Sequence, residues 1–344
     1  MVSGCFTALI TPFMDGHVDA AGLEKLIEFQ ISNGVSGIVA AGTTGESPTL
    51  DWREHNQVTE RIAGMIKGQG LCIAGTGSNS TTETLEASRH AVKAGAEALL
   101  LVDPYYNGPS SLEIRKEYIE PVARAFPEST VIPYVVPGRT GAQIMAEDLA
   151  LAHGHYPNVS AVKEATGNIE NMRWTRQCCG EDFSIISGDD NLTCRMMTDP
   201  LIKASGVISV YSNIFPRAMS QMVAAAARGE EGVAARLEGQ LEPLLGMVTV
   251  TTTEKTPFGP ILCRSRNPLP VKTLMAILGM PSGSCRPPLG RMTAGGVEKL
   301  LTAARSMFTT SPELFAPLAD FFDIDVADRL NNYDIINSLI YEDY

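Results

Sequence analysis

The chain has 344 residues, 44% of them hydrophobic and 19% charged, and it carries a formal net charge of −12. This composition predicts a globular protein with a large core, and the negative charge argues against nucleic acid and anionic membrane surfaces as partners. The seven cysteines form no Cys-x-x-Cys pair and no metal-binding spacing with histidine, which favours reduced thiols. No apolar run approaches the ~20 residues that span a bilayer, and no secretory signal is recognisable, so we expect a cytoplasmic protein.

Short apolar or β-branched runs alternate with amphipathic stretches over the first two thirds of the chain. Helical periodicity is clearest over residues 22–32, 52–66, 82–94 and 111–125. The strands are expected near residues 4–10, 36–41, 71–76, 97–102, 130–135, 159–164, 183–187 and 205–211. This regular alternation of strand and helix over about 225 residues predicts an α/β fold, a closed (β/α)8 TIM barrel rather than an open doubly wound sheet.

Three regions are predicted from the change of pattern along the chain. Residues 1–228 form the catalytic barrel, and residues 229–304 form a C-terminal helical domain in which only helices are expected. Residues 305–344 form an acidic extension. Its last part, residues 311–344, has eight acidic residues and one basic residue, Arg329, but is rich in Leu, Ile, Phe and Tyr. Because a disordered tail would lack such residues, we expect it to dock on the barrel or on a neighbouring subunit, with helices over residues 320–330 and 334–340.

Lys163 is the most unusual residue, because it lies in the apolar, strand-like run of residues 159–165. Period-two alternation places it on the same face as Val159 and Ala161, so its amine is expected in a core-like environment. Burial disfavours the charged form and makes a neutral amine available to attack a carbonyl as a Schiff-base nucleophile. The alternative is a lysine at a strand end that extends to solvent or pairs with Glu164.

Other unusual residues follow the predicted strands at their carboxyl ends, where TIM-barrel active sites lie. Residues 42–47 (Gly-Thr-Thr-Gly-Glu-Ser) can be a turn with N-capping hydroxyls, or a loop whose N–H groups bind a carboxylate while a Thr hydroxyl relays protons. Tyr134 can be a half-buried aromatic residue on a strand, or it can donate a proton beside the lysine. Arg139 can be a solvated loop charge, or its guanidinium can bind a substrate carboxylate through two hydrogen bonds. Asp189-Asp190 resembles a metal pair but more often caps the following helix, and without a third ligand we predict no metal.

In combination these strings resemble the dihydrodipicolinate synthase and N-acetylneuraminate lyase family over roughly residues 3–300. The resemblance rests on Gly42-Thr43-Thr44-Gly45-Glu46, Tyr134 with residues 137–141, Val162-Lys163-Glu164-Ala165, Ser187-Gly188-Asp189-Asp190 and Asn267-Pro268-Leu269-Pro270-Val271-Lys272. One residue departs from the family pattern: Val135 stands where the family usually has Asn. Thr43-Thr44 and the Gly-Arg-Thr-Gly string are closer to the synthases than to the sialic-acid lyases.

The resemblance implies a synthase that joins pyruvate to L-aspartate-4-semialdehyde, an early step of diaminopimelate and lysine biosynthesis. Lys163 would form the imine with pyruvate, and Tyr134, Thr43 and Tyr106 would relay protons, with Tyr106 reaching in from a neighbouring subunit. Because Tyr106 would come from a neighbouring subunit, a homo-oligomer is expected, either a dimer or a tetramer. No metal or organic cofactor is implied, because an iminium alone makes the pyruvate methyl group acidic enough to form an enamine.

The resemblance also implies how the substrates are held. Thr44 would act with Thr43 in binding the pyruvate carboxylate through backbone N–H groups. Arg139 would hold the carboxylate of the semialdehyde, and the backbone carbonyl of Ile208 would orient the lysine.

A second set of residues matches the site at which regulated synthases bind L-lysine as a feedback inhibitor. The set comprises Ser47, Trp52, His55, Asn79, Glu83 and Tyr105. Trp52 and His55 share a helix face, where a core or interface role is an alternative, and Asn79 can equally be an N-cap followed by Glu83 in its helix. Glu83 supplies the charge that an ammonium group requires, and Tyr105 adjoins Tyr106.

Two alternative functions remain open from the sequence. One is another pyruvate-dependent Schiff-base lyase or dehydratase, acting on N-acetylneuraminate or a 2-keto-3-deoxy sugar acid, for which Val135 is the supporting feature. The other is a non-catalytic metabolite-binding member, in which Lys163, Tyr134 or Arg139 would be expected to be lost. All three residues are present.

Overall fold

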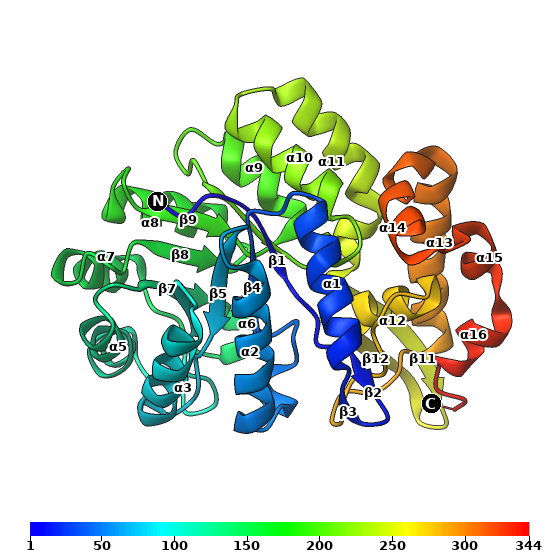
Figure 1. Ribbon diagram of the computed structural model, residues 1–344, viewed down its shortest axis with the longest axis horizontal. Helices are drawn as coiled ribbons and strands as arrows, with labels where there is room; N and C mark the ends of the chain where they lie inside the picture. The colour runs from blue at the N-terminus through cyan, green and yellow to red at the C-terminus, as the bar shows by residue number, and fades with distance from the viewer. Residues whose placement is uncertain (344) are drawn as a thin grey trace.

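The computed structural model describes residues 1–343, and within them eight parallel strands close into a barrel surrounded by helices (Figure 1). β1 pairs with both β4 and β10, which closes the sheet. The predicted (β/α)8 fold is therefore confirmed, and each strand lies within its expected range. The strands are β1 (Gly4–Ala8), β4 (Gly37–Ala40), β5 (Leu71–Gly75), β6 (Ala98–Val102), β7 (Thr130–Val135), β8 (Ala161–Glu164), β9 (Ser184–Ser187) and β10 (Gly206–Ser209).

The helices cover the outside of the barrel, and their ends follow local capping signals. Asp51 forms a capping box with Glu54 at the start of α2, and the Ser80 side chain accepts from the N–H of Glu83 at the start of α3. The helices are α1 (Ala20–Ser32), α2 (Trp52–Ile66), α3 (Thr81–Ala94), α4 (Ser111–Glu113), the π-helical η2 (Ile114–Ile119), α5 (Glu120–Ala125), α6 (Pro137–Thr140), α7 (Ala146–His155), α8 (Ile169–Cys179), α9 (Thr193–Thr198) and α10 (Pro216–Ala227). A short hairpin of β2 (Phe13–Met14) and β3 (His17–Val18) precedes α1.

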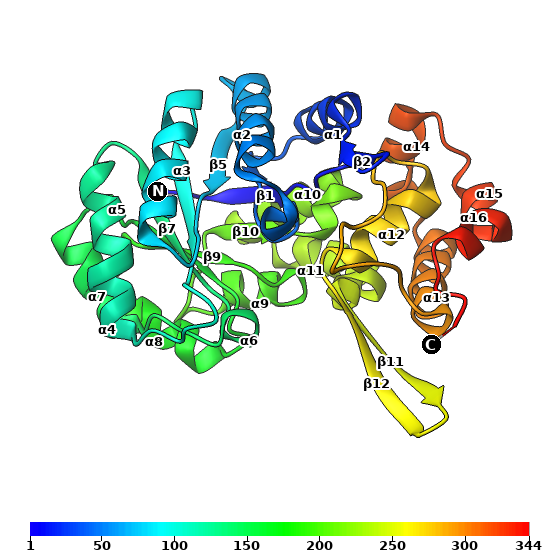
Figure 2. The same ribbon diagram turned by 90° about the horizontal axis from the view of Figure 1, so that it is seen from below.

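The expectation that only helices follow residue 229 is wrong. After α11 (Glu231–Leu245) the chain forms an antiparallel hairpin of β11 (Thr249–Thr256) and β12 (Gly259–Arg266). Thr and Val alternate at the start of β11, a β-branched pattern that favours a strand, and Gly259 has φ of 110° at the turn. Figure 2 shows the hairpin projecting from the body of the molecule, and Phe258 at its tip is 99% exposed.

The C-terminal region docks on its own chain. α12 (Leu269–Leu278) and α13 (Ala294–Thr310) pack beside the barrel, and they are followed by α14 (Ala316–Phe322), α15 (Val326–Asn331) and α16 (Tyr333–Ser338). The barrel residue Phe29 has its ring 5.3 and 5.0 Å from those of Phe321 and Phe322. The Arg329 guanidinium donates to the carbonyl oxygens of Ile277 and Ala276 at the end of α12. The predicted docking of residues 311–343 is thus confirmed, and Tyr344 lies outside the described residues.

One detail of that region differs from the sequence expectation. A single helix over residues 320–330 is wrong, because Asp323 adopts a left-handed conformation (φ of 55°) that ends α14. The Asp325 side chain then accepts from the N–H of Asp328 and starts α15. The proposed division at residues 304 and 305 falls inside α13, so the fold places the start of the extension after Thr310.

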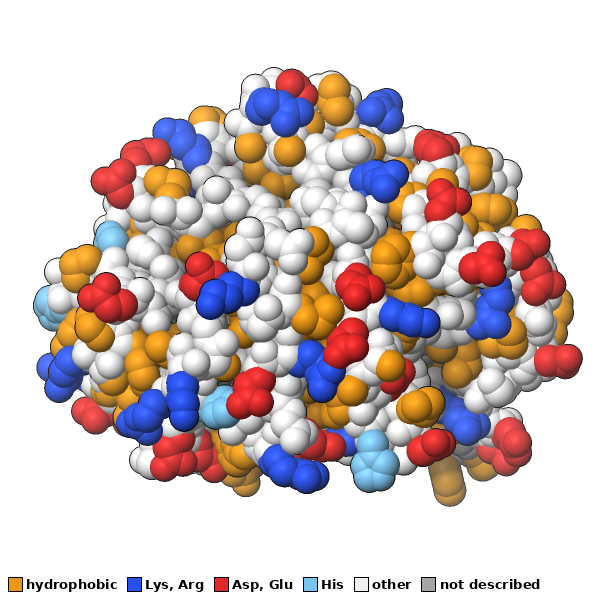
Figure 3. Space-filling model, in the orientation of Figure 1, with side chains coloured by type: hydrophobic (Ala, Val, Ile, Leu, Met, Phe, Trp, Pro, Cys, Tyr) orange, Lys and Arg blue, Asp and Glu red, His pale blue; other side chains and the backbone are white. Residues whose placement is uncertain are grey.

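The surface carries charges of both signs. On the face in Figure 3, acidic and basic side chains are interspersed, with small groups of hydrophobic side chains between them. Among the helices of residues 1–343, none combines the length and the apolar character that a membrane span requires.

Candidate active site

Lys163 lies inside the barrel near the carboxyl ends of the strands. It is the third residue of β8, its neighbours in register are Tyr134 on β7 and Ile186 on β9, and it is 6% exposed. The Lys163 Nζ atom lies 4.1 Å from the centre of the Tyr134 ring. The ring face favours a cation and the phenol can exchange protons, so this amine has both an electrostatic and an acid–base neighbour.

Glu164 does not pair with Lys163, because alternation turns its side chain to the opposite face of the sheet. Its carboxylate accepts from the N–H of Thr166 at 2.8 Å and from the Asn171 amide at 2.9 Å. Burial raises the pKa of Glu164 above its ordinary value. The alternative reading, a solvent-directed or Glu164-paired lysine, is therefore wrong.

Val135 faces away from the barrel interior. It packs in the apolar layer between strands and helices, whereas Tyr134 and Val136 belong to the interior cluster and line the cavity described below. Val135 pairs in register with Glu164, and the neighbouring Asp103 N–H donates to the Tyr134 carbonyl. The departure from the family pattern thus lies outside the substrate cavity.

Asp103 is a buried carboxyl group in this outer layer. One oxygen accepts from the N–H of Ile144 at 3.1 Å, and the other has no hydrogen-bond partner within residues 1–343. Burial raises the pKa of Asp103 to about 8, and the nearby Glu164 carboxyl adds to the shift. Burial thus favours the neutral, protonated form of this carboxyl group.

The loop of residues 42–47 follows β4 and is folded by its own backbone. The N–H of Glu46 donates to the Thr43 carbonyl and that of Ser47 to the Gly42 carbonyl. Within residues 1–343, the backbone N–H groups of Thr43 and Thr44 donate to no acceptor. Because Gly42 and Thr43 line the cavity, these free donors suit a carboxylate better than the capping alternative, and η1 (Ser47–Thr49) has no side-chain cap.

Arg139 lies on α6 at the rim of the same cavity. Desolvation by surrounding atoms lowers the pKa of its guanidinium, and the nearby Arg266 acts in the same direction. Asp189 faces both cations: its own burial raises the pKa of its carboxyl, while Lys163 and Arg139 oppose that shift. We had not assigned Asp189 to the site from the sequence, although its position after β9 was a signal.

The expectation that Asp189-Asp190 caps the following helix is wrong. The Asp190 carboxylate accepts from the N–H groups of Val210 and Tyr211 at 3.0 and 2.8 Å, which ties the end of β9 to that of β10. No side-chain cap is present at η3 (Asp190–Leu192). In the described part of the chain, no three His, Cys, Asp or Glu side chains are grouped as metal ligands would be.

One cavity of about 390 Å³ brings most of the predicted site residues together. Three of them, Thr43, Tyr134 and Arg139, come from the catalytic and substrate-binding set, and Lys163 adjoins the cavity through Tyr134. The same cavity is lined by most of the predicted lysine-binding set, namely Ser47, Trp52, His55, Glu83 and Tyr105. Asn79 is exposed and does not line the cavity, but its side-chain oxygen accepts from the N–H of the lining residue Tyr105 at 3.1 Å; Ser80 rather than Asn79 caps α3.

The Trp52 and His55 rings meet edge to face at 5.1 Å in the wall of the cavity. Trp52 is 42% exposed, so it is not a core residue, whereas His55 is buried. The His55 Nε2 atom bonds to the Gly75 carbonyl at 2.9 Å, Nδ1 has no partner within residues 1–343, and burial lowers the pKa of the ring. Glu83 accepts from the Ser78 hydroxyl.

Two predicted site residues do not line the cavity: Tyr106 lies apart from the other site residues, whereas Ile208 belongs to the same interior cluster as Tyr134. Tyr106 is 91% exposed on the loop after β6, with a left-handed φ of 78° that is uncommon for a tyrosine. Ile208 is buried in β10, in register with Phe6 of β1.

The fold and this site define a class of protein, the (β/α)8-barrel lyases that use a lysine Schiff base. The model of the dihydrodipicolinate synthetase family matches residues 1–306, and the chain belongs to this family.

Relatives with assigned names agree with this membership. A 4-hydroxy-tetrahydrodipicolinate synthase of Methanococcus vannielii is 39% identical over 306 residues, which are 89% of this chain and 99% of that protein. A dihydrodipicolinate synthase of Acinetobacter baumannii, solved in complex with pyruvate, superposes with a TM-score of 0.80 at 34% identity and covers 89% of this chain and 99% of its own. A Cyanidioschyzon merolae synthase solved with lysine bound has a TM-score of 0.79 at 33% identity, with coverages of 89% and 98%.

Proposed function

We propose that this protein is a 4-hydroxy-tetrahydrodipicolinate synthase that condenses pyruvate with L-aspartate-4-semialdehyde through a Schiff base on Lys163. The observation that carries the proposal is the buried Lys163 amine, 4.1 Å from the ring of Tyr134 and beside a cavity with free backbone donors. The A. baumannii relative solved with pyruvate supports the choice of the first substrate.

Lys163, Thr43, Thr44 and Tyr134 have separate roles in the proposed reaction. The Lys163 amine adds to the pyruvate ketone, and loss of water gives an iminium. The N–H groups of Thr43 and Thr44 hold the pyruvate carboxylate, and Tyr134 with the Thr43 hydroxyl carries the protons that these steps release and consume. Loss of a methyl proton gives the enamine, whose carbon attacks the aldehyde of the second substrate.

The second substrate is held by Arg139. Its guanidinium lies at the cavity rim and can make two parallel hydrogen bonds to a carboxylate. The exposed Tyr106 is assigned to the site of a second copy of this chain, where it completes the proton relay. The protein then works as a homo-oligomer, and its cytoplasmic location stays a prediction. Val135 no longer favours a sugar-acid lyase, because its side chain faces away from the cavity.

L-Lysine is proposed to bind in the outer part of the same cavity and to inhibit. The Glu83 carboxylate provides a partner for an ammonium group, and the Trp52 and His55 rings form an apolar wall for the side chain. The lysine-bound C. merolae relative supports the regulator. The neighbouring Tyr105 and Tyr106 connect this region to the proton relay.

Borohydride reduction in the presence of pyruvate tests the chemistry. One reduced pyruvyl group is expected on Lys163, located by peptide mass mapping. Lys272 is an internal control, because it is also buried and lies 4.3 Å from the Phe13 ring, but it is paired with Glu46. Label on Lys272, or no label, would contradict the proposed mechanism. A substrate panel with the semialdehyde, N-acetylneuraminate and 2-keto-3-deoxy-gluconate separates the synthase from the lyases.

A further inference from the structure

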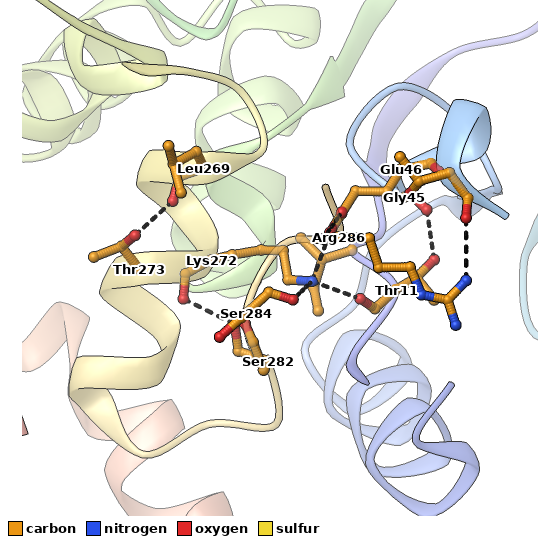
Figure 4. Close-up of polar contacts among 12 residues, drawn as sticks. Thr11, Gly45, Glu46, Leu269, Lys272, Thr273, Ser282, Ser284 and Arg286 are labelled. Carbon is orange, nitrogen blue, oxygen red and sulfur yellow. Dashed lines mark hydrogen bonds and ion pairs between the residues drawn. The ribbon is translucent and has the colours of Figure 1, made fainter. Parts of the chain in front are cut away.

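Glu46 follows the proposed carboxylate-binding residues Thr43 and Thr44 in the same loop. Its side chain is fully buried against the C-terminal region, where it contacts Lys272 and Arg286. Glu46 has a left-handed backbone (φ of 57°), a conformation that is strained for a non-glycine residue and that persists only where surrounding contacts support it. One carboxylate oxygen lies 2.6 Å from the Nζ of Lys272 on α12, and the other accepts from the Arg286 N–H at 2.8 Å. Figure 4 shows this group of contacts.

Lys272 is as deeply buried as its partner. Side-chain exposure is 1% for Lys272 and 0% for Glu46. Besides Glu46, the ammonium group donates to the carbonyl oxygens of Thr11 at 3.0 Å and Ser284 at 3.5 Å. Each of its three N–H groups thus has an acceptor, as an ion pair without water requires.

A second contact from the same region reaches Thr44 itself. The Asn267 amide, just before α12, donates to the Thr44 hydroxyl at 2.9 Å, and both side chains are buried. The Thr11 hydroxyl donates to the Gly45 carbonyl at 2.7 Å. Thr44, Gly45 and Glu46 are therefore each held from outside the loop, while the backbone N–H groups of Thr43 and Thr44 remain free.

We propose that Asn267 and Lys272 of the helical domain are positioning residues for pyruvate, which aim the free N–H groups of Thr43 and Thr44 at its carboxylate. This inference rests on the function proposed above. Free donors bind a carboxylate well only when they are fixed before binding, because otherwise binding must also order the loop. The helical domain is in this way a part of the substrate site, although it contributes no atom that touches the substrate.

The test compares Asn267→Ala and Lys272→Met with a matched control, Thr273→Val. Thr273 is buried in the same helix, but its hydroxyl bonds only to the Leu269 carbonyl of that helix, at 2.8 Å. The readout is the pyruvate concentration that gives half-maximal borohydride labelling of Lys163. We expect this concentration to rise about tenfold in both positioning variants, which corresponds to about 1.4 kcal/mol, and to stay within about twofold in the control.

Two further measurements separate positioning from general destabilisation. In both positioning variants, the KM for the semialdehyde should change by a smaller factor than the pyruvate concentration for half-maximal labelling. This difference is expected whether or not the melting temperature also falls. If Asn267 acts through the Thr44 hydroxyl, the double variant Asn267→Ala/Thr44→Val should bind pyruvate no more weakly than Thr44→Val alone.

Unchanged half-maximal pyruvate in Asn267→Ala and Lys272→Met, with labelling of wild type intact, would overturn the inference. If Lys272→Met does not fold, Asn267→Ala decides alone, because it leaves no buried charge unpaired. Absence of label in the wild-type protein would instead contradict the proposed function itself.

Discussion

Phe315 gives the sharpest test of what the C-terminal extension does. Its side chain is 1% exposed, and its ring lies edge to face with Phe215 of the barrel domain at 5.0 Å and with Phe308 of α13 at 5.3 Å. Replacing a buried phenylalanine with alanine costs about 3–5 kcal/mol, since apolar contact is lost and a cavity remains. The two edge-to-face pairs place Phe315→Ala in the upper half of that range.

The expected change in melting temperature follows from the size of the protein. Unfolding entropy of about 2.1 cal/mol/K per residue gives about 0.7 kcal/mol/K for 344 residues, so a cost of about 4–5 kcal/mol should lower the melting temperature of Phe315→Ala by about 5–7 °C. Phe258→Ala is the matched control: the same substitution at a side chain that is 99% exposed should shift melting by less than about 1 °C.

Thermal unfolding followed by circular dichroism measures both variants under one set of conditions. Labelling of Lys163 with pyruvate and borohydride should be unchanged in Phe315→Ala, because Phe315 does not line the cavity. A melting temperature equal to that of Phe258→Ala would refute the argument that the extension stabilises the fold. Lost labelling in a protein that remains folded would instead show that the extension acts on the site.

Four further outcomes are expected. Arg139→Ala should raise the KM for the semialdehyde about 10- to 100-fold, the loss of one charge-assisted contact, while pyruvate labelling stays intact; a defect in labelling would place Arg139 in the pyruvate site. Glu83→Ala should abolish L-lysine binding in calorimetry, and binding at wild-type affinity would exclude the proposed lysine site. Truncation after Thr310 should lower the melting temperature and preserve labelling; a truncated protein as stable as the full chain would argue against the docking energy inferred from Phe315. Because the pKa of Asp103 is raised to about 8, the native state keeps a proton that the unfolded chain loses above about pH 4, so stability falls as pH rises from about 4 to about 8. The melting temperature of Asp103→Asn relative to wild type should therefore increase over this interval, and a constant difference would be inconsistent with a protonated Asp103.

The sequence was sufficient for the barrel because its strands and helices follow two clear periods. It failed for the hairpin of β11 and β12, because the alternation of Thr and Val at the start of β11 lies in a region otherwise patterned as helix. It failed also at Asp323, where a left-handed residue divides an amphipathic stretch that reads as one helix. At Asp323 the helical period continues through the residue, but the left-handed backbone there ends the helix. In the hairpin, the short alternation at the start of β11 was hidden by the helical pattern around it.

The candidate site was predictable where chemistry follows directly from residue type and strand position. Lys163, Tyr134 and Arg139 were singled out in this way, and the structure brings Tyr134 and Arg139 to one cavity with Lys163 beside Tyr134; their catalytic roles stay predictions. Glu46 and Lys272 lie 226 positions apart, and no spacing rule joins residues so distant. The role proposed for Tyr106 requires a second copy of the chain, because in one folded chain this residue is 91% exposed and does not line the cavity.

Lys163 and Lys272 show why burial alone does not identify a reactive lysine. Both are buried, and each lies just over 4 Å from an aromatic ring. All three N–H groups of Lys272 have oxygen acceptors, one of them a carboxylate, so its nitrogen offers no lone pair to a carbonyl. Lys163 makes no salt bridge within residues 1–343; it lies over the ring of Tyr134, whose phenol can exchange protons, and the Asp189 carboxyl lies near enough for their charges to interact. A direct hydrogen-bonded contact with a carboxylate therefore separates the two lysines: Lys272 is held by Glu46 at 2.6 Å, whereas Lys163 has no such contact within residues 1–343 and lies beside the cavity.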